Sequence, residues 1–199
     1  MNGWRLTGLL SLLLVAMSLY FLATHAGDVE GLRLVIRSTA RTSLVLFAMA
    51  FSAAAMAELM AGSATRWQRR NRRYLGVSFA VSHAIHLVAL IALARTDAEL
   101  FWTLTNPANI ALAGTAYVLL AAMTATSFDR TASWLGPRQW RLLHLVGGWY
   151  IWISFAVAIG KRLPQGPIYW AMMALVLAVG IVRLVAMSRR SRRARVVAA

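Results

Sequence analysis

Long apolar runs dominate the hydrophobic pattern of this chain. Each run is about as long as the 20 or so residues that a helix needs to cross a bilayer, and short polar or charged stretches separate the runs. The pattern predicts one transmembrane domain over residues 1–199. We expect its helices at 4–24, 42–62, 74–94, 108–127, 142–160 and 167–187, followed by a basic tail at 188–199.

Turn-forming residues stand where this layout needs connections between helices. They are Asn106-Pro107 before the fourth predicted helix, Gly136-Pro137 before the fifth, and Pro164 with Gly166-Pro167 before the sixth. The first apolar run could also be a signal peptide. Trp4 and Arg5 precede it, in the way that a positively charged segment precedes the apolar core of a signal peptide. From Leu6 to Ala23 the run is longer than the usual signal core, so we expect an uncleaved helix.

The composition agrees with a membrane protein. Hydrophobic residues make up 60% of the chain and charged residues 14%, whereas a soluble domain is nearer half apolar and a quarter charged. Six spanning helices leave too few residues for a second soluble domain of ordinary size. The chain has no cysteine, which excludes disulfides, thiolate ligands and Cys-ligated iron–sulfur clusters.

The net charge of +15 reflects arginines that lie between and after the apolar runs. A nucleic-acid-binding protein would carry them as a stripe on a folded surface, so we expect no nucleic acid partner. The positive-inside rule assigns the more basic side of the bundle, and with it both termini, to the cytoplasm. The basic residues of that side are Arg5, Arg66, Arg69, Arg70, Arg72, Arg73, Arg130, Arg138, Arg141, Arg183, Arg189, Arg190, Arg192, Arg193 and Arg195.

Ionisable groups inside a bilayer are costly, and each is therefore a candidate for function. His83 and His86 fall within the third predicted helix, and His144 falls near the start of the fifth. At i and i+3, His83 and His86 share one helix face. A haem iron takes its axial ligands from opposite sides, so these neighbours are not expected to ligate one iron together. A packed histidine bonded to a neighbouring helix is the alternative for each.

Two further ionisable groups have simpler alternatives. Glu58 could serve a proton or quinone path, or it could be a hydrated carboxylate near the membrane surface. Arg41 opens the second predicted helix and could contact the propionates of a haem. Its alternative is an arginine whose head group reaches the membrane interface.

Several motifs together resemble the ferric reductase-like transmembrane domain family. They are Arg72-Arg73-Tyr74-Leu75-Gly76 followed ten residues later by His86, Arg41-Thr42, and Gly136-Pro-Arg-Gln-Trp-Arg-Leu-Leu-His144. The chain is especially similar to the haem-binding membrane subunit of bacterial periplasmic methionine sulfoxide reductase systems, over roughly residues 35–185. The resemblance implies an all-α six-helix bundle that holds b-type haem between its third and fifth helices. It also implies that His86 and His144 are haem ligands.

The chain departs from the family at Val157. Family members usually have a second histidine about 13 residues after the first on the fifth helix, and valine cannot bind iron. His86 and His144 also differ in depth, because His86 lies roughly 18 Å beyond the start of its predicted helix and His144 only a turn into its own. Three outcomes stay open: haem on His86 with a replacement ligand, haem on His86 and His144 in distorted geometry, or no haem. The candidate replacement ligands are Met123, Met56 and Met60.

The function expected from these residues and the resemblance is electron transfer across a bacterial inner membrane. A cytoplasmic or quinol donor would supply the electrons, and a periplasmic oxidoreductase would accept them. No Gly-rich dinucleotide motif is present, so a flavin or a quinone would come through a separate partner. The alternative is a haem-free membrane interaction or assembly subunit, or a small transporter, of the same fold.

Overall fold

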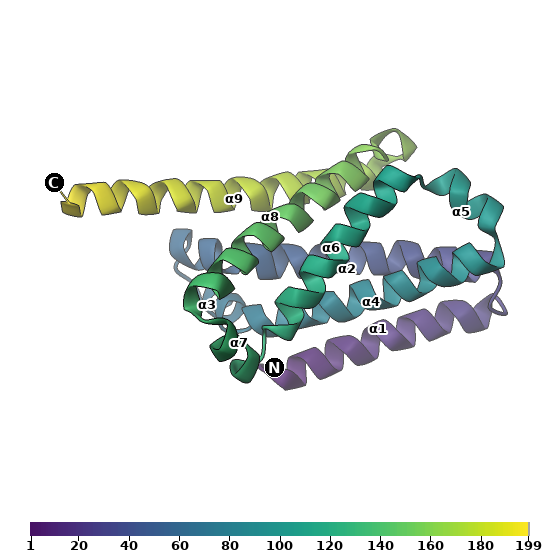
Figure 1. Cartoon of the computed structure of the whole chain (residues 1–199), viewed down its shortest axis with the longest axis horizontal. Helices are drawn as coiled ribbons and strands as arrows, with labels where there is room; N and C mark the ends of the chain where they lie inside the picture. Colours follow the sequence, from purple (N-terminus) through teal and green to yellow (C-terminus); the bar gives the residue numbers. More distant parts are fainter. Residues whose placement is uncertain (199) are drawn as a thin grey trace.

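In a computed structural model of the chain, a long helix forms at each apolar run (Figure 1). The structure describes the backbone of residues 1–198 and the side chains of residues 1–192. Within this part, six helices are long and apolar enough to cross a membrane. They are α1 (Trp4–Thr24), α2 (Val29–Leu59), α4 (Arg72–Thr96), α6 (Pro107–Ala125), α8 (Pro137–Gly160) and α9 (Pro167–Ala198).

Short helices lie in the connections between these spans. They are α3 (Ser63–Arg70), α5 (Ala98–Leu104), α7 (Asp129–Leu135) and the 3₁₀ turn η1 (Leu163–Gln165). The described residues contain no strand. The all-α, multi-pass membrane fold predicted from the apolar pattern is therefore confirmed.

The start of α2 is where the prediction was wrong. We expected this helix at 42–62, but it runs over Val29–Leu59, so the connection from α1 is only a short turn. Asp28 caps the helix, because its carboxylate accepts a hydrogen bond of 2.8 Å from the backbone N–H of Gly31. The first turns of α2 are helical although they lie outside the apolar run.

Charged side chains explain why hydropathy missed these turns. Glu30 forms ion pairs with Arg33 and Arg37 along the helix surface, at 3.1 and 3.3 Å. Arg41 therefore lies well inside α2 and does not open it, although it does stand where the apolar run begins. Its side chain is exposed, as expected for an arginine at the membrane interface.

Two other boundaries also differ from the prediction. The helix expected from residue 142 begins at Pro137, since proline fits the first position of a helix. At the other end of the chain, α9 continues to Ala198 through most of the predicted tail at 188–199. The side chains of Arg193 and Arg195 in that tail lie outside the described residues.

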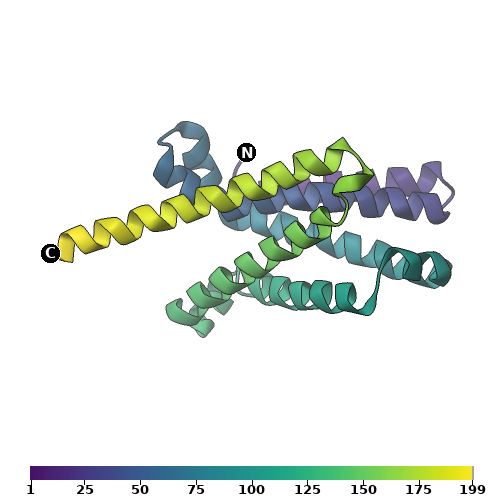
Figure 2. The ribbon, with the colours of Figure 1, turned by 90° about the horizontal axis from the view of Figure 1, so that it is seen from above.

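Helix α2 is the central helix of the bundle. It packs against α4, α9 and α1, whereas α6 packs mainly against α8, and α8 packs against both α6 and α9. Figure 2 shows α6 and α8 together on one side of α2. An aromatic cluster joins α2, α4 and α8. From the ring centroid of Phe47 on α2, the distances are 4.9 to 5.4 Å to those of Phe51 on α2, Phe79 on α4 and Phe155 on α8.

Glycines allow α8 to approach α6 and α9 closely. A Cβ atom at Gly147 of α8 would lie 2.5 Å from the sulfur of Met123 on α6. A Cβ atom at Gly180 of α9 would lie 2.8 Å from the ring of Trp152 on α8. Small residues at helix contacts are typical of membrane bundles, where close packing drives association.

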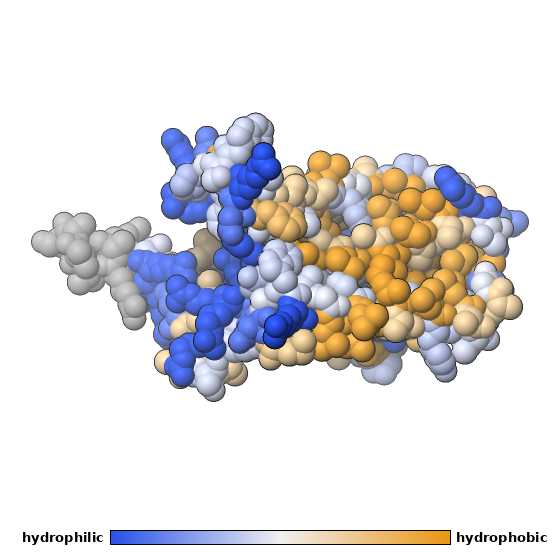
Figure 3. Space-filling model, turned by 90° about the horizontal axis from the view of Figure 1, so that it is seen from below, coloured by the Kyte–Doolittle hydropathy of each residue, from blue (hydrophilic) through white to orange (hydrophobic). Residues whose placement is uncertain are grey.

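The two ends of the bundle differ in charge. We call one of them the arginine-rich end, which holds Arg69, Arg70, Arg72, Arg73, Arg183 and Arg190. Figure 3 shows hydrophilic residues gathered at this end and an apolar belt beside it. Apolar side chains in the spanning helices are exposed, such as Val88 of α4 at 67% and Val118 of α6 at 70%, as expected for groups that face lipid tails.

Both termini belong to the arginine-rich end. The backbone N–H of Gly3 donates to the side chain of Asn71, between α3 and α4. Near the other terminus, Arg190 of α9 forms an ion pair with Glu58 at the end of α2. The cytoplasmic location of this end stays a prediction from the positive-inside rule.

Candidate functional site

His86 is held by α2 through one ring nitrogen. Its Nδ1 lies 3.0 Å from the carbonyl oxygen of Ile36 and 3.1 Å from the hydroxyl of Thr39. A carbonyl oxygen can only accept a hydrogen bond, so Nδ1 carries the proton and Nε2 keeps its lone pair. Metal-ligating histidines are usually held in this way, with the second nitrogen free for the metal.

His83 lies beside His86, as the i, i+3 spacing predicts. The two rings are nearly parallel, with centroids 5.4 Å apart and an angle of 13° between their planes. His83 Nδ1 lies 3.2 Å from the hydroxyl of Ser43 on α2. The ring of Tyr117 on α6 is 4.7 Å away, and the Tyr117 hydroxyl donates to the His83 carbonyl at 3.2 Å.

Hydroxyl groups join the two histidines to α2. The hydroxyl of Ser82 on α4 lies 2.9 Å from that of Ser43 and 3.0 Å from that of Thr42, and it donates to the Thr39 carbonyl at 3.2 Å. Ser82, Ser43 and Thr39 are almost completely buried. Every fully buried side-chain nitrogen and oxygen atom in the described part has a partner.

These hydroxyls are not among the site residues predicted from the sequence, although their signal is present there. Thr39 and Ser43 are one turn apart on α2, and Ser82 precedes His86 by one turn on α4. Such a stripe of small polar residues in an apolar helix marks an interhelical hydrogen-bonding face.

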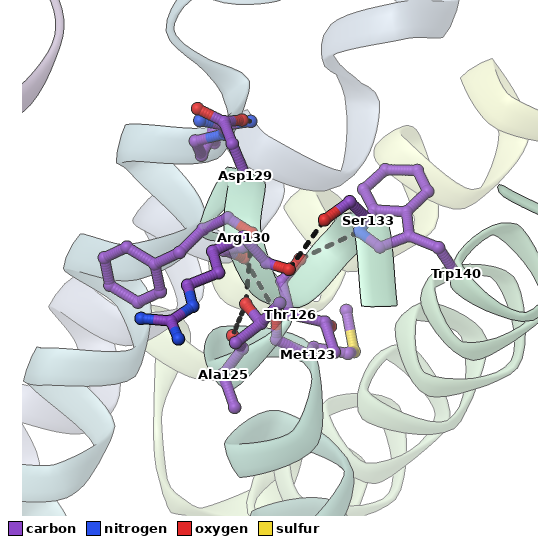
Figure 4. Close-up of polar contacts among 11 residues, drawn as sticks. Met123, Ala125, Thr126, Asp129, Arg130, Ser133 and Trp140 are labelled. Atoms are coloured by element: carbon purple, nitrogen blue, oxygen red, sulfur yellow. Dashed lines mark hydrogen bonds and ion pairs between the residues drawn. The ribbon is translucent and has the colours of Figure 1, made fainter. Parts of the chain in front are cut away.

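His144 occupies a different environment, at the arginine-rich end. The ring of Trp140 stacks on it at 4.1 Å between centroids, and its Nε2 lies 3.5 Å from the Thr126 hydroxyl. Trp140 Nε1 donates to the Thr126 carbonyl at 2.9 Å, which ties the start of α8 to the end of α6 (Figure 4). The position of His144 therefore depends on the turn between α6 and α8.

Helix α7 within this turn is anchored to α4 by charge. Asp129 of α7 forms an ion pair with Arg73 of α4. The hydrogen bond from Arg73 lowers the pKa of the Asp129 carboxyl below its usual value. Phe128 stacks on Trp4 of α1, with ring centroids 5.3 Å apart, and so adds an apolar contact to the same anchor.

His144 lines a cavity of about 320 Å³, which we call the large cavity. Its apolar walls come from α2, α4, α6 and α8, and the residues include Phe47, Phe51, Phe79, Leu120 and Ile151. Its cationic residues come from α3, α4 and α9, and they are Arg69, Arg70, Arg72, Arg73 and Arg183. An apolar pocket with cationic groups and one imidazole suits an apolar molecule that carries negative charge.

The structure brings His83 and His86 together but places His144 apart from them. Phe155 of α8 lies 6.1 Å from Phe79 and 6.0 Å from His83, measured between ring centroids, which sets α8 and α4 in register at that level. His144 precedes Phe155 by 11 residues, or roughly 16 Å along the helix, whereas His86 lies beyond His83 in the opposite direction. A single haem ligated by both His86 and His144 is therefore not favoured by this arrangement.

The remaining candidate residues lie away from the His83–His86 pair, and among them only Met123 lines the large cavity with His144. Val157 is 37% exposed, and Glu58 is paired with Arg190. Met123 lines the large cavity and packs against Gly147, one turn from His144. It would therefore approach a bound iron from the same side as His144 and not from the opposite side, where the second axial ligand is needed. Met56 is half-buried and Met60 is exposed. The described residues contain no cluster of three or more His, Asp or Glu side chains that could hold a metal ion on their own.

Comparisons with protein-family models, with curated proteins and with solved structures found no match to this chain. Membership of the ferric reductase-like family therefore stays a prediction from the motifs.

Proposed function

We propose that the protein is an electron-transfer subunit of a membrane oxidoreductase system and that it holds b-type haem. One observation supports this most directly: His144 stands in the wall of the large apolar cavity, which is lined by arginines from three helices. Haem combines an apolar macrocycle with two anionic propionates, and its iron takes imidazole nitrogen as a ligand. The residues of the large cavity fit each of these three properties.

His86 is the second proposed ligand. Its Nδ1 is bonded to Ile36, so its Nε2 is available as an iron ligand. Since His86 and His144 lie at different depths, each would serve a separate haem position that keeps one of its usual two histidines. Bound haem would supply one-electron transfer, and the role of this chain is to hold it inside the bilayer.

The donor and the acceptor lie outside this chain in the proposal. A cytoplasmic protein or a quinol would give electrons at the arginine-rich end, and a periplasmic oxidoreductase would take them at the opposite end of a bacterial inner membrane. The lack of a dinucleotide-binding motif in the sequence supports a separate donor, which could itself carry flavin.

Visible spectroscopy of the purified protein tests the proposal. The protein is produced with haem supplied, and spectra are recorded in the oxidised state and after dithionite reduction, together with a haem assay. We expect a b-type difference signal that decreases in His144→Ala or His86→Ala. His25→Ala is the matched control, because His25 lies in the turn between α1 and α2, away from the large cavity. A colourless wild-type protein would contradict the proposal.

A haem-free membrane interaction or assembly subunit is the second candidate function. The observation that favours it is the aromatic packing between α4 and α8, where Phe155 contacts Phe79 and His83. Val157 in place of a family histidine agrees with it. A transporter has less support, since Pro107, Pro137 and Pro167 begin helices and no long helix in the described part is broken near its middle.

A further inference from the structure

A second, smaller cavity lies between α2, α4 and α9 at the arginine-rich end. Its volume is about 110 Å³, and we call it the three-arginine cavity because Arg72, Arg183 and Arg190 line it. The rest of its wall is small or apolar and consists of Phe51, Ala54, Ala55, Ala186 and Met187. This space is large enough for several water-sized groups, which suits a tetrahedral anion.

Positive charge in this cavity is only partly neutralised. Arg190 is paired with Glu58. The only other acidic residue at this end is Asp129, which is paired with Arg73. The four remaining acids of the chain belong to the opposite end and are Asp28, Glu30, Asp97 and Glu99.

Arg183 is positioned for a ligand by its neighbours. Its Nη1 donates to the Phe51 carbonyl at 3.1 Å, and its guanidinium carbon lies 4.0 Å from the centre of the Phe51 ring and 5.5 Å from that of Trp149. This contact holds the guanidinium plane and uses only one of its five N–H donors. A planar guanidinium with free N–H donors binds phosphate through bidentate hydrogen bonds.

Arg72 has no hydrogen bond or ion pair from its side chain within the described residues, although it is only partly exposed. A guanidinium in a partly buried position without a counter-ion is costly. Arg72 and Arg183 also stand in the wall that the three-arginine cavity shares with the large cavity. An anion bound between them would neutralise both.

We propose that the three-arginine cavity binds a phosphoryl group. Two sources share this chemistry, the phosphate of an anionic lipid head group and free phosphate. The apolar side chains around the cavity and its place at the membrane surface favour the lipid, because basic pockets between helices on the cytoplasmic side bind anionic head groups. This site shares Arg72 and Arg183 with the large cavity that we propose for haem, but its test measures lipid retention and not haem.

Lipid retention tests the site without any reference to haem. The full chain is placed in nanodiscs of equal phosphatidylglycerol and phosphatidylcholine, extracted with mild detergent and analysed by native mass spectrometry. We expect wild type to retain phosphatidylglycerol preferentially and Arg72→Gln to reduce this preference at least about tenfold, as loss of a charge-assisted contact should. Arg192→Gln is the matched control, because Arg192 is exposed on α9 and does not line the cavity.

A conservative variant and a phosphate titration complete the experiment. Arg72→Lys keeps the charge but loses the planar fork, so its loss of preference should be smaller than that of Arg72→Gln. If inorganic phosphate, but not chloride at equal ionic strength, displaces the lipid and raises the Tm of wild type, free phosphate is the ligand of the same site. Equal retention of the two lipids by wild type, with no phosphate effect, would overturn the proposal even if Arg72→Gln does not fold, and so would an unchanged preference in a folded Arg72→Gln.

Discussion

His86 Nδ1 lies 3.0 Å from the carbonyl oxygen of Ile36, so a backbone group of α2 orients an imidazole of α4. Ile36 precedes the stretch that hydropathy alone marks as membrane-spanning, in turns that follow the Asp28 cap and carry the Glu30 ion pairs. The charged start of α2 therefore positions one of the two proposed haem ligands. The histidine and its partner are 50 residues apart in the chain.

Replacement of Ser82 by alanine should destabilise the contact between α2 and α4. The Ser82 hydroxyl lies within hydrogen-bonding distance of three oxygen atoms on α2, and its removal leaves buried partners with fewer bonds. We expect a loss of about 1 kcal/mol in the free energy of unfolding, since single interhelical hydrogen bonds in membranes contribute about that much. Unfolding in mixed micelles measures it. Ser188→Ala, at an exposed position on α9, should show no comparable loss.

Replacement of Gly147 by alanine should displace the Met123 side chain that packs between α6 and α8. The added Cβ would lie 2.5 Å from the Met123 sulfur, and overpacking of this kind costs about 1 to 3 kcal/mol. Gly114→Ala is the control, because no atom lies within 4 Å of the added Cβ at that position. Thermal unfolding of Gly147→Ala should show a lower Tm, and Met123→Ala in the same chain should restore part of it. Equal Tm values for the two single glycine variants would contradict this packing.

Lowering the pH should release α7 from α4. The pKa of Asp129 is lowered in the folded chain by Arg73, so the ion pair stabilises the fold at pH values above the unfolded pKa near 4. Its contribution is lost as the pH falls through the lower, folded pKa. Because both side chains are exposed, the effect should be small and confined to the turn. Limited proteolysis near α7 should increase at low pH, and Asp129→Asn should show that increase already at neutral pH.

The ion pair between Glu58 and Arg190 should contribute little to stability. The Arg190 side chain is 58% exposed and that of Glu58 is 18% exposed, so water screens one partner well. A double-mutant cycle with Glu58→Gln and Arg190→Gln should give a coupling free energy of about 0.2 to 1 kcal/mol. A value several times larger would show that the pair is shielded from water.

Much of the fold could be predicted from the sequence because it depends on local properties. The length of an apolar run decides whether a helix can span a bilayer, and the asymmetry of the arginines decides its orientation. Likewise, the spacing of His83 and His86 is enough to place both on one face of a helix. Hydropathy failed at the first turns of α2, because Glu30 and its arginines form a helix that the apolar pattern does not contain.

The candidate sites depend on contacts between helices that are far apart in the chain. Arg72 and Arg183 meet at one cavity, and His144 faces apolar rings from α2 and α4. In lipid, each apolar run forms a helix that makes its own backbone hydrogen bonds, whatever helices lie beside it. The run itself therefore does not specify which helix packs against which. The sequence by itself determined that the chain forms six apolar helices long enough to span a membrane, whereas their orientation stays a prediction. Only the tertiary structure decided the partners of each histidine and arginine, because close packing and interhelical hydrogen bonds select them.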